Sequence, residues 1–222
     1  MMLCLVTDRR RLGAALGLEA GAWAEALRAQ VVAAAEAGMD LVQVREPDLE
    51  AAALVRLVRG LAGGIRQTST RLLVNDRLDV ALAAGAAGVH LKEQSFPVAA
   101  VRAATRPGFW IGRSVHDPAG AAMAGNADYL IAGTVLPTVS KPSAAVLGWE
   151  GLARVVTSAA GRPVLAIGGI DLPSIPLVAA SGAAGVAGIG VFIPTAGERL
   201  AEFVKKRVIT MRLGFDSAHP VP

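Results

Sequence analysis

Short apolar runs that each end in a polar or glycine-rich cluster recur along this chain of 222 residues. Leu-Val-Gln-Val-Arg-Glu at 41–46 is one example, and Leu-Leu-Val-Asn-Asp-Arg at 72–77 is another. Each run is followed by a stretch whose apolar side chains recur with helical spacing. Strands that alternate with helices in this way form a parallel sheet, because each connection must return to the same edge.

Eight such runs predict eight strands, at residues 3–7, 41–45, 71–75, 88–91, 109–114, 129–134, 163–167 and 185–189. Eight units in a chain of this length leave about 28 residues for each, close to the minimum for right-handed crossovers. We therefore predict an α/β fold, a (β/α)8 TIM barrel, in one compact domain at 1–208. Residues 209–222 show no apolar periodicity, and we expect them to be a poorly ordered tail.

Composition argues against several classes of protein. Aromatic residues make up 4% of the chain, too few for a surface that stacks on bases, and the charge of +4 comes from scattered Arg and Lys. We expect no nucleic-acid partner, and a mildly basic chain suits a small anionic substrate. The apolar segment 163–194 is broken by Asp171 and several prolines, which argues against a membrane span. The single cysteine, Cys4, and the absence of a basic region before the first apolar run predict a cytoplasmic protein.

Glycines follow the last two predicted strands. Gly168 and Gly169 come after the seventh strand, and the eighth runs into Ile189 and Gly190. In a barrel, backbone N–H groups at these two strand ends can approach a phosphate closely, and we predict that these four residues bind one. The alternative is that the glycines only make room for tight packing. The expected substrate is a phosphate ester.

Two histidines lie at predicted strand ends. His116 follows the fifth strand, and its imidazole can take up and return a proton near neutral pH. The alternative is that it packs beside the helix predicted to start at Asp117-Pro118. His90 lies between Val89 and Leu91 at the end of the fourth strand, and we expect a structural role for it.

Polar groups also end the second and third strands. Arg45, with Gln43, is a fixed cation suited to a carboxylate or a phosphate. Asn75 and Asp76 could contact a substrate nitrogen, and Asp76 could instead cap a helix or hold Mg²⁺. A magnesium site for a diphosphate normally needs a second carboxylate, and Glu93 is an unconvincing one. We predict no metal site.

The connection after the sixth strand, residues 135–148, is long enough to be a lid or a binding loop. It carries Thr138, Ser140 and Lys141 as candidate substrate contacts, and Ser114, two residues before His116, is a further one. Surface salt bridges are the alternative for Lys141 and for Arg45.

These clusters, in this order, resemble the superfamily of thiamine phosphate synthase and thiazole tautomerase over roughly residues 3–205. The matching pieces are Val-Thr-Asp-Arg at 6–9, Gln-Val-Arg-Glu at 43–46, Val-Asn-Asp-Arg at 74–77, Gly-Val-His-Leu at 88–91, Gly-Arg-Ser-Val-His at 112–116, Pro-Thr at 137–138 through Lys-Pro at 141–142, Leu-Gly-Trp-Glu-Gly-Leu at 147–152 and Ala-Ile-Gly-Gly-Ile at 166–170. The resemblance implies the barrel fold and an enzyme of thiamine biosynthesis.

Two positions depart from the synthase pattern. Pro47 stands where the synthase has a lysine, and Ser95 stands where it has an aspartate that binds Mg²⁺. Both changes remove charge that a diphosphate leaving group needs. The exits of the predicted fourth and fifth strands, Ser-Phe-Pro at 95–97 and Ile-Gly-Arg-Ser-Val-His at 111–116, are similar to those of the tautomerase. Asn75-Asp76 and the 137–142 loop are more similar to the synthase.

The resemblance to the tautomerase implies that His116 moves a proton while a carboxylated dihydrothiazole ethyl phosphate becomes the aromatic thiazole. It implies no cofactor, and a small-molecule thiazole phosphate as partner. The alternatives are a thiamine phosphate synthase that joins hydroxymethylpyrimidine diphosphate to thiazole phosphate with Mg²⁺, a non-catalytic binding or regulatory protein for thiamine-related phosphates, and another phosphate-ester enzyme. A homo-oligomer is possible.

Overall fold

The computed structural model describes residues 1–138, 145–195 and 197–218. Eight parallel strands close into a barrel in the order β1 to β8, each paired with its neighbours in sequence and β1 with β8. The strands are β1 (Met2–Val6), β2 (Leu41–Val44), β3 (Arg71–Asn75), β4 (Gly88–Leu91), β5 (Trp110–Val115), β6 (Tyr129–Ala132), β7 (Val164–Ala166) and β8 (Gly185–Gly188). The predicted TIM barrel is confirmed, with strand boundaries that agree to within two residues.

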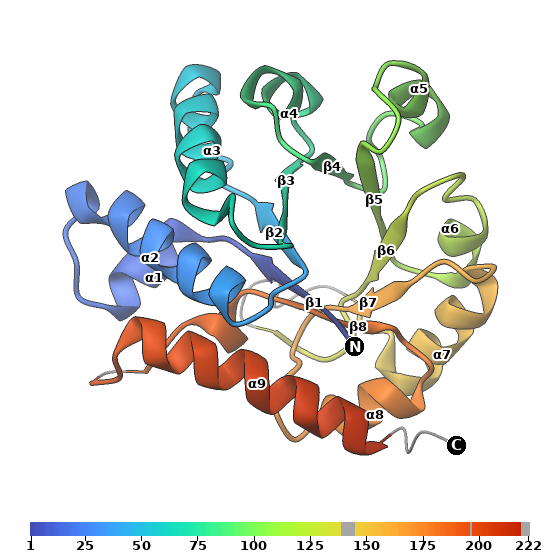
Figure 1. Ribbon diagram of the computed structural model, residues 1–222. Helices are drawn as coiled ribbons and strands as arrows, with labels where there is room; N and C mark the ends of the chain where they lie inside the picture. The colour runs from blue at the N-terminus through green and yellow to red at the C-terminus, as the bar shows by residue number, and fades with distance from the viewer. Residues whose placement is uncertain (139–144, 196, 219–222) are drawn as a thin grey trace.

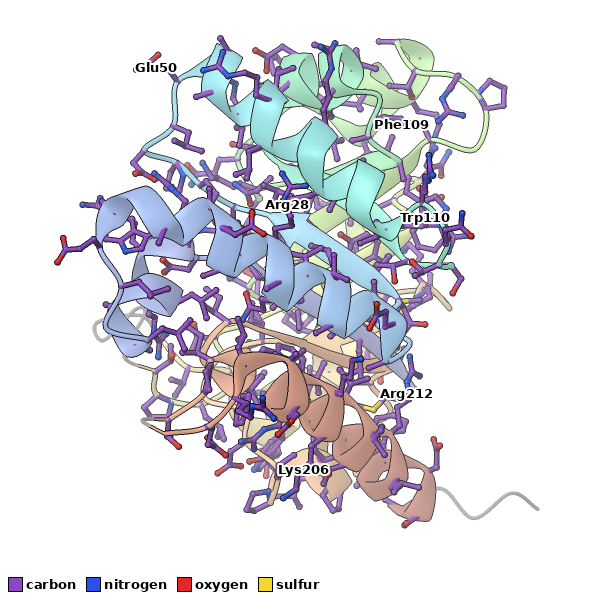
Figure 2. All side chains as sticks on the ribbon, turned by 60° about the vertical axis from the view of Figure 1, so that its left-hand side comes forward. Arg28, Glu50, Phe109, Trp110, Lys206 and Arg212 are labelled. Carbon is purple, nitrogen blue, oxygen red and sulfur yellow. The ribbon has the colours of Figure 1, made fainter. Side chains whose placement is uncertain are left out.

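Helices cover the outside of the barrel (Figure 1). They are α1 (Arg9–Ala15), α2 (Trp23–Glu36), α3 (Ala51–Ile65), α4 (Leu78–Ala84), α5 (Val98–Ala103), α6 (Pro118–Ala122), α7 (Gly148–Ser158), α8 (Ile175–Ala180) and α9 (Leu200–Ala218), with short 3-10 turns at Ala20–Ala22 and Gly190–Phe192. Figure 2 shows α3, α2 and α9 side by side on one flank. Among the described residues, none of these helices combines the length and apolar character that crossing a bilayer demands.

Alternate residues of each strand face the two sides of the barrel wall, as the pleat of a strand requires. Leu41 of β2 belongs to the inner cluster of side chains, whereas Val42 and Val44 pack outward against the helices. The inner cluster includes Cys4, which is fully buried as expected. In β4, Val89 and Leu91 point outward, so His90 points into the barrel.

The prediction of a poorly ordered tail from residue 209 is wrong, because α9 continues to Ala218. Met211 and Phe215 lie four residues apart and are buried, on the same face of the helix as Val208. This face packs against α2 and α8. The sequence hides the stripe because the exposed apolar residues Ile209 and Leu213 lie between its members and blur the helical period. Residues 219–222 lie outside the described part of the chain.

Candidate functional site

A pocket of about 910 Å³ opens at the carboxyl ends of the strands. It brings together most of the residues that the sequence singled out: Gln43, Arg45, Asn75, Ser114, His116, Thr138, Gly168, Gly169, Ile189 and Gly190. Ser140 and Lys141 lie outside the described residues. Asp76 does not line the pocket itself, although its neighbour Asn75 does. The expectation that strand ends converge on one site therefore holds for the described candidates except Asp76.

His116 lies just past β5, at the edge of this pocket, with its side chain 45% exposed. Its Nδ1 is hydrogen-bonded to the carbonyl oxygen of Gly133. A carbonyl only accepts, so Nδ1 carries the proton and Nε2 holds the lone pair of the neutral imidazole. Nε2 lies 4.0 Å from Oε2 of Glu93. The arrangement gives one oriented nitrogen that can accept a proton.

Glu93 belongs to the segment after β4, and Arg113 of β5 fixes this segment. The Arg113 guanidinium donates to the carbonyl oxygen of Phe96 at 2.7 Å and also to that of Glu93. The segment therefore stays beside His116 even though it has no regular structure. Sequence reasoning did not find this role, because nothing local in Gly-Arg-Ser-Val-His shows which carbonyls the arginine reaches.

His90 is part of a buried polar chain in the barrel interior. Its Nδ1 lies 3.0 Å from the Tyr129 hydroxyl, and its Nε2 lies 2.9 Å from Oγ of Ser114. Burial lowers the pKa of His90 to about 3, so the ring is neutral at physiological pH. Gly112 makes room for this pair, since a Cβ there would lie 2.3 Å from the Tyr129 ring. These contacts agree with the expected structural role, and they also orient Ser114 in the pocket.

Gln43 and Arg45 present groups without partners in the described part of the chain. The amide nitrogen Nε2 of Gln43 is buried, belongs to a residue that lines the pocket, and has no hydrogen-bond partner among the described residues. The Arg45 backbone N–H donates to Oγ1 of Thr7 at 3.0 Å, while no partner of its guanidinium occurs among the described residues. A buried donor without a partner costs about 1–3 kcal/mol, so an acceptor on a ligand is the natural complement.

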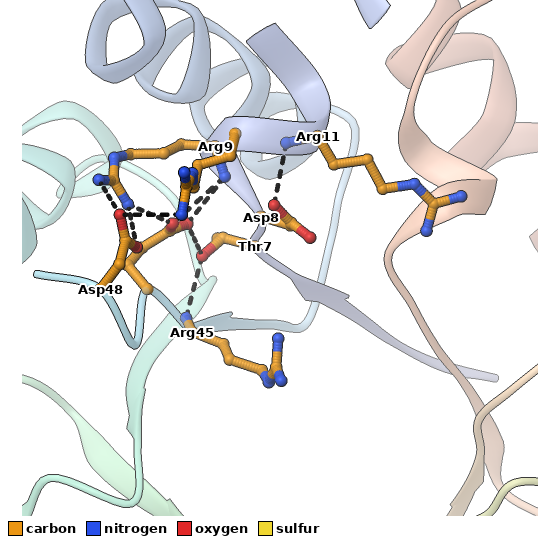
Figure 3. Close-up of polar contacts among 8 residues, drawn as sticks. Thr7, Asp8, Arg9, Arg11, Arg45 and Asp48 are labelled. Carbon is orange, nitrogen blue, oxygen red and sulfur yellow. Dashed lines mark hydrogen bonds and ion pairs between the residues drawn. The ribbon is translucent and has the colours of Figure 1, made fainter. Parts of the chain in front are cut away.

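A polar network holds Arg45 in place by joining the ends of β1 and β2 (Figure 3). The buried Glu46 accepts from Oγ1 of Thr7 at 2.6 Å and from Nη1 of Arg9 at 2.9 Å. Arg9 also makes two bonds to the carboxylate of Asp48. Burial raises the pKa of Glu46, against the hydrogen bonds from Thr7 and Arg9. Figure 3 shows the Arg11 and Arg45 side chains extending away from these ion pairs.

The glycines after β7 and β8 form a narrow wall of the pocket. Gly168 and Gly169 have φ values of 98° and 70°, and a Cβ at either would lie 2.6 Å from the segment after β6. A Cβ at Gly190 would lie 2.8 Å from Nη2 of Arg11, so this guanidinium lies against the glycine backbone. Exposed backbone beside a cation suits a phosphate. Sequence reasoning missed Arg11, because Arg11 and Gly190 lie near opposite ends of the sequence.

Asp76 is engaged by its own chain. Oδ2 lies 3.1 Å from Nζ of Lys92, and the Lys92 backbone N–H donates to Oδ1. Burial tends to raise the pKa of Asp76, but hydrogen bonds from Ser95 and Lys92 outweigh it and the pKa is lowered. Lys92 is a pocket residue that sequence reasoning missed.

The comparisons with known proteins agree with this geometry. The profile of the TMP-TENI family, described as thiamine monophosphate synthase, matches residues 5–192. A Geobacter sulfurreducens protein named "Putative thiamine-phosphate synthase" is 41% identical over 194 residues, which is 86% of each chain. A rice protein named "Probable thiamine biosynthetic bifunctional enzyme, chloroplastic" is 36% identical over 76% of this chain, which spans 31% of that longer protein.

Among solved structures, thiamine phosphate pyrophosphorylase from Pyrococcus furiosus superposes with a TM-score of 0.78 and is 32% identical. The match covers 98% of this chain and 96% of that one. The barrel, the pocket at its strand ends and these matches together show that the chain belongs to the TMP-TENI family of thiamine biosynthesis.

Proposed function

We propose that this member of the family is a thiazole tautomerase, which isomerises a carboxylated dihydrothiazole ethyl phosphate to the aromatic thiazole phosphate carboxylate. The observation that carries the proposal is His116, which lines the pocket with Nδ1 bonded to a carbonyl and Nε2 left as the base. An isomerisation of this kind needs one group that takes a proton from one carbon and returns one to another. Aromatisation supplies the driving force.

The other pocket residues suit the two anionic ends of this substrate. Gly168, Gly169 and Gly190, with Arg11 against the last, would hold the phosphate. The Arg45 guanidinium and the orphaned amide of Gln43 would meet the polar groups of the ring. The Glu93 carboxylate, 4.0 Å from Nε2, would stabilise the imidazolium that forms after proton removal. Each step stays within groups that the chain itself supplies.

The second candidate is a thiamine phosphate synthase, and the names of the relatives favour it. The presence of Asn75 in the pocket also suits that reading. Magnesium, which the synthase reaction implies, does not fit the residues present. The carboxylate of Asp76 is already bonded to the Lys92 ammonium, and Ser95 supplies no second carboxylate where the synthase pattern has an aspartate.

One experiment separates the candidates. The purified protein is given the dihydrothiazole phosphate carboxylate in EDTA, and separately hydroxymethylpyrimidine diphosphate with thiazole phosphate and Mg²⁺. We expect the aromatic product in the first reaction, and a rate that falls by about 100-fold or more in His116→Gln, since general acid–base groups contribute that much. His219→Gln, a histidine to which the sequence gives no role, is the matched control.

Thiamine phosphate formed in the second reaction, with no isomerisation in the first, would replace the tautomerase proposal with the synthase. Binding of thiazole phosphate with no product in either reaction would instead indicate a binding or regulatory protein. Isomerisation at an unchanged rate in His116→Gln would move the proton transfer to another residue.

A further inference from the structure

Lys92 stands where the pocket would otherwise present a free carboxylate. Its Nζ lies 3.1 Å from Oδ2 of Asp76, and its backbone N–H bonds Oδ1 at 3.2 Å. Ser95 also donates a hydrogen bond to Asp76. Groups of the chain itself therefore take up both oxygens of the Asp76 carboxylate.

A divalent cation does not fit beside this ion pair. Mg²⁺ requires near-octahedral oxygen ligands, usually including one or two carboxylates. An ammonium on the same carboxylate repels a second cation and also fills the space. Within the part of the chain that the structure describes, no group of three or more His, Cys, Asp or Glu side chains is placed to hold a metal ion. The nearby Glu93 faces His116 instead.

The ammonium itself remains available to a ligand. The Lys92 side chain is 64% exposed and lines the pocket. Its Nζ makes one ion pair among the described residues, with Asp76. An ammonium carries three N–H donors, so two can bind an anion while the third keeps the contact with Asp76. Asp76 fixes the position of an otherwise flexible side chain.

The place of Lys92 in the barrel indicates which end of a ligand it meets. Lys92 follows β4, whereas the phosphate-type glycines follow β7 and β8, on the opposite side of the closed barrel. The next residue, Glu93, lies beside His116. Lys92 is therefore suited to a second anionic group that lies near the proton-transfer centre and away from the phosphate.

We propose that Lys92 takes the place of a divalent metal at this edge of the pocket, and that it binds the carboxylate of the substrate without a metal ion. The identity of the ligand rests on the proposed function. The replacement of the metal does not, and it is tested without turnover.

The first test is binding of Mn²⁺, as the metal alone, to the protein by electron paramagnetic resonance. We expect no binding at about one equivalent to the wild-type protein. The double variant Lys92→Gly with Ser95→Asp removes the ammonium and adds a second carboxylate, and we expect it to gain a Mn²⁺ site. Stoichiometric Mn²⁺ binding by the wild type, or none by the folded double variant, would overturn the proposal.

The second test compares two ligands in EDTA by calorimetric titration: the thiazole phosphate carboxylate and the same thiazole phosphate without the carboxylate. We expect the carboxylate to tighten binding to the wild type by about fivefold, the value of one partly exposed ion pair. The preference should vanish in Lys92→Met. It should persist in Lys205→Met, a matched lysine that pairs with Glu36 on the outside of the barrel.

The outcomes separate this inference from the function itself. If the tighter binding of the carboxylated ligand survives in Lys92→Met, or appears only with added Mg²⁺, the proposed role of Lys92 is wrong. A protein that shows the preference but forms no aromatic product keeps the role of Lys92 and loses the tautomerase proposal.

Discussion

The buried His90 should make the barrel less stable in mildly acidic solution, because the unfolded chain takes up a proton there and the folded ring does not. The ring is buried, and its pKa falls from 6.5 in an unfolded chain to about 3 in the fold. The folded protein therefore binds fewer protons than the unfolded chain between these two values. The stability that comes from a neutral His90 is fully present above about pH 6.5, and it is lost as the pH falls toward 3.

The size of this effect follows from the shift. Each pH unit below 6.5 costs about 1.4 kcal/mol until the folded-state pKa is reached, so the free energy of unfolding should fall by about 2 kcal/mol between about pH 7.5 and pH 5. Carboxylates with lowered pKa values, such as Asp76, change the free energy of unfolding only at pH values below this window.

The assay is urea unfolding, followed by tryptophan fluorescence at several pH values. His90→Asn keeps a polar group near Tyr129 but does not titrate, so the free energy of unfolding of this variant, though lower, should not fall across the window. Glu46, whose pKa is raised by burial, acts in the opposite sense near the acid end. His116→Gln is the control and should keep the wild-type slope, because it leaves the buried contacts of His90 with Tyr129 and Ser114 in place. A wild-type protein without the slope, or a His90→Asn variant with the same slope, would refute the reasoning.

Three further changes test the pocket wall, the last helix and the segment beside His116. Gly169→Ala should weaken binding of inorganic phosphate in a titration, because its φ is 70° and the new Cβ would meet the segment after β6, whereas Gly197→Ala, with open space around it, should not. Phe215→Ala should lower the free energy of unfolding by about 3 kcal/mol, and the exposed Leu213→Ala by less than about 0.5 kcal/mol. Arg113→Met should raise KM for the isomerisation and speed amide hydrogen exchange in residues 92–97, and unchanged exchange would show that the arginine does not hold them.

The strand-end clusters were enough to predict the barrel and most of its site. Alternation of apolar runs with helical stretches is a local property, so it can be read from the sequence. Closure of a parallel sheet then brings the strand ends together, whatever the details of packing. That is why Gln43, Arg45, Ser114 and His116 meet in one pocket as expected.

Contacts between distant segments could not be predicted in the same way. Met211 and Phe215 form a buried face only because α9 lies against α2 and α8, and the sequence around them shows no clear periodicity. Arg11 reaches Gly190 only because β1 and β8 are neighbours in the closed barrel.

The sequence by itself determined the fold class, and it singled out the glycines after β7 and β8 and His116 as candidates for phosphate binding and proton transfer, because each of these inferences depends on residue type and local spacing. Only the tertiary structure decided how the charges combine. In the folded chain, Nδ1–H of His116 donates to the carbonyl oxygen of Gly133. Asp76 is paired with Lys92, so its carboxylate is not free to bind a metal. The physical reason is that an ion pair depends on distance in space, which the spacing of residues along the chain does not determine.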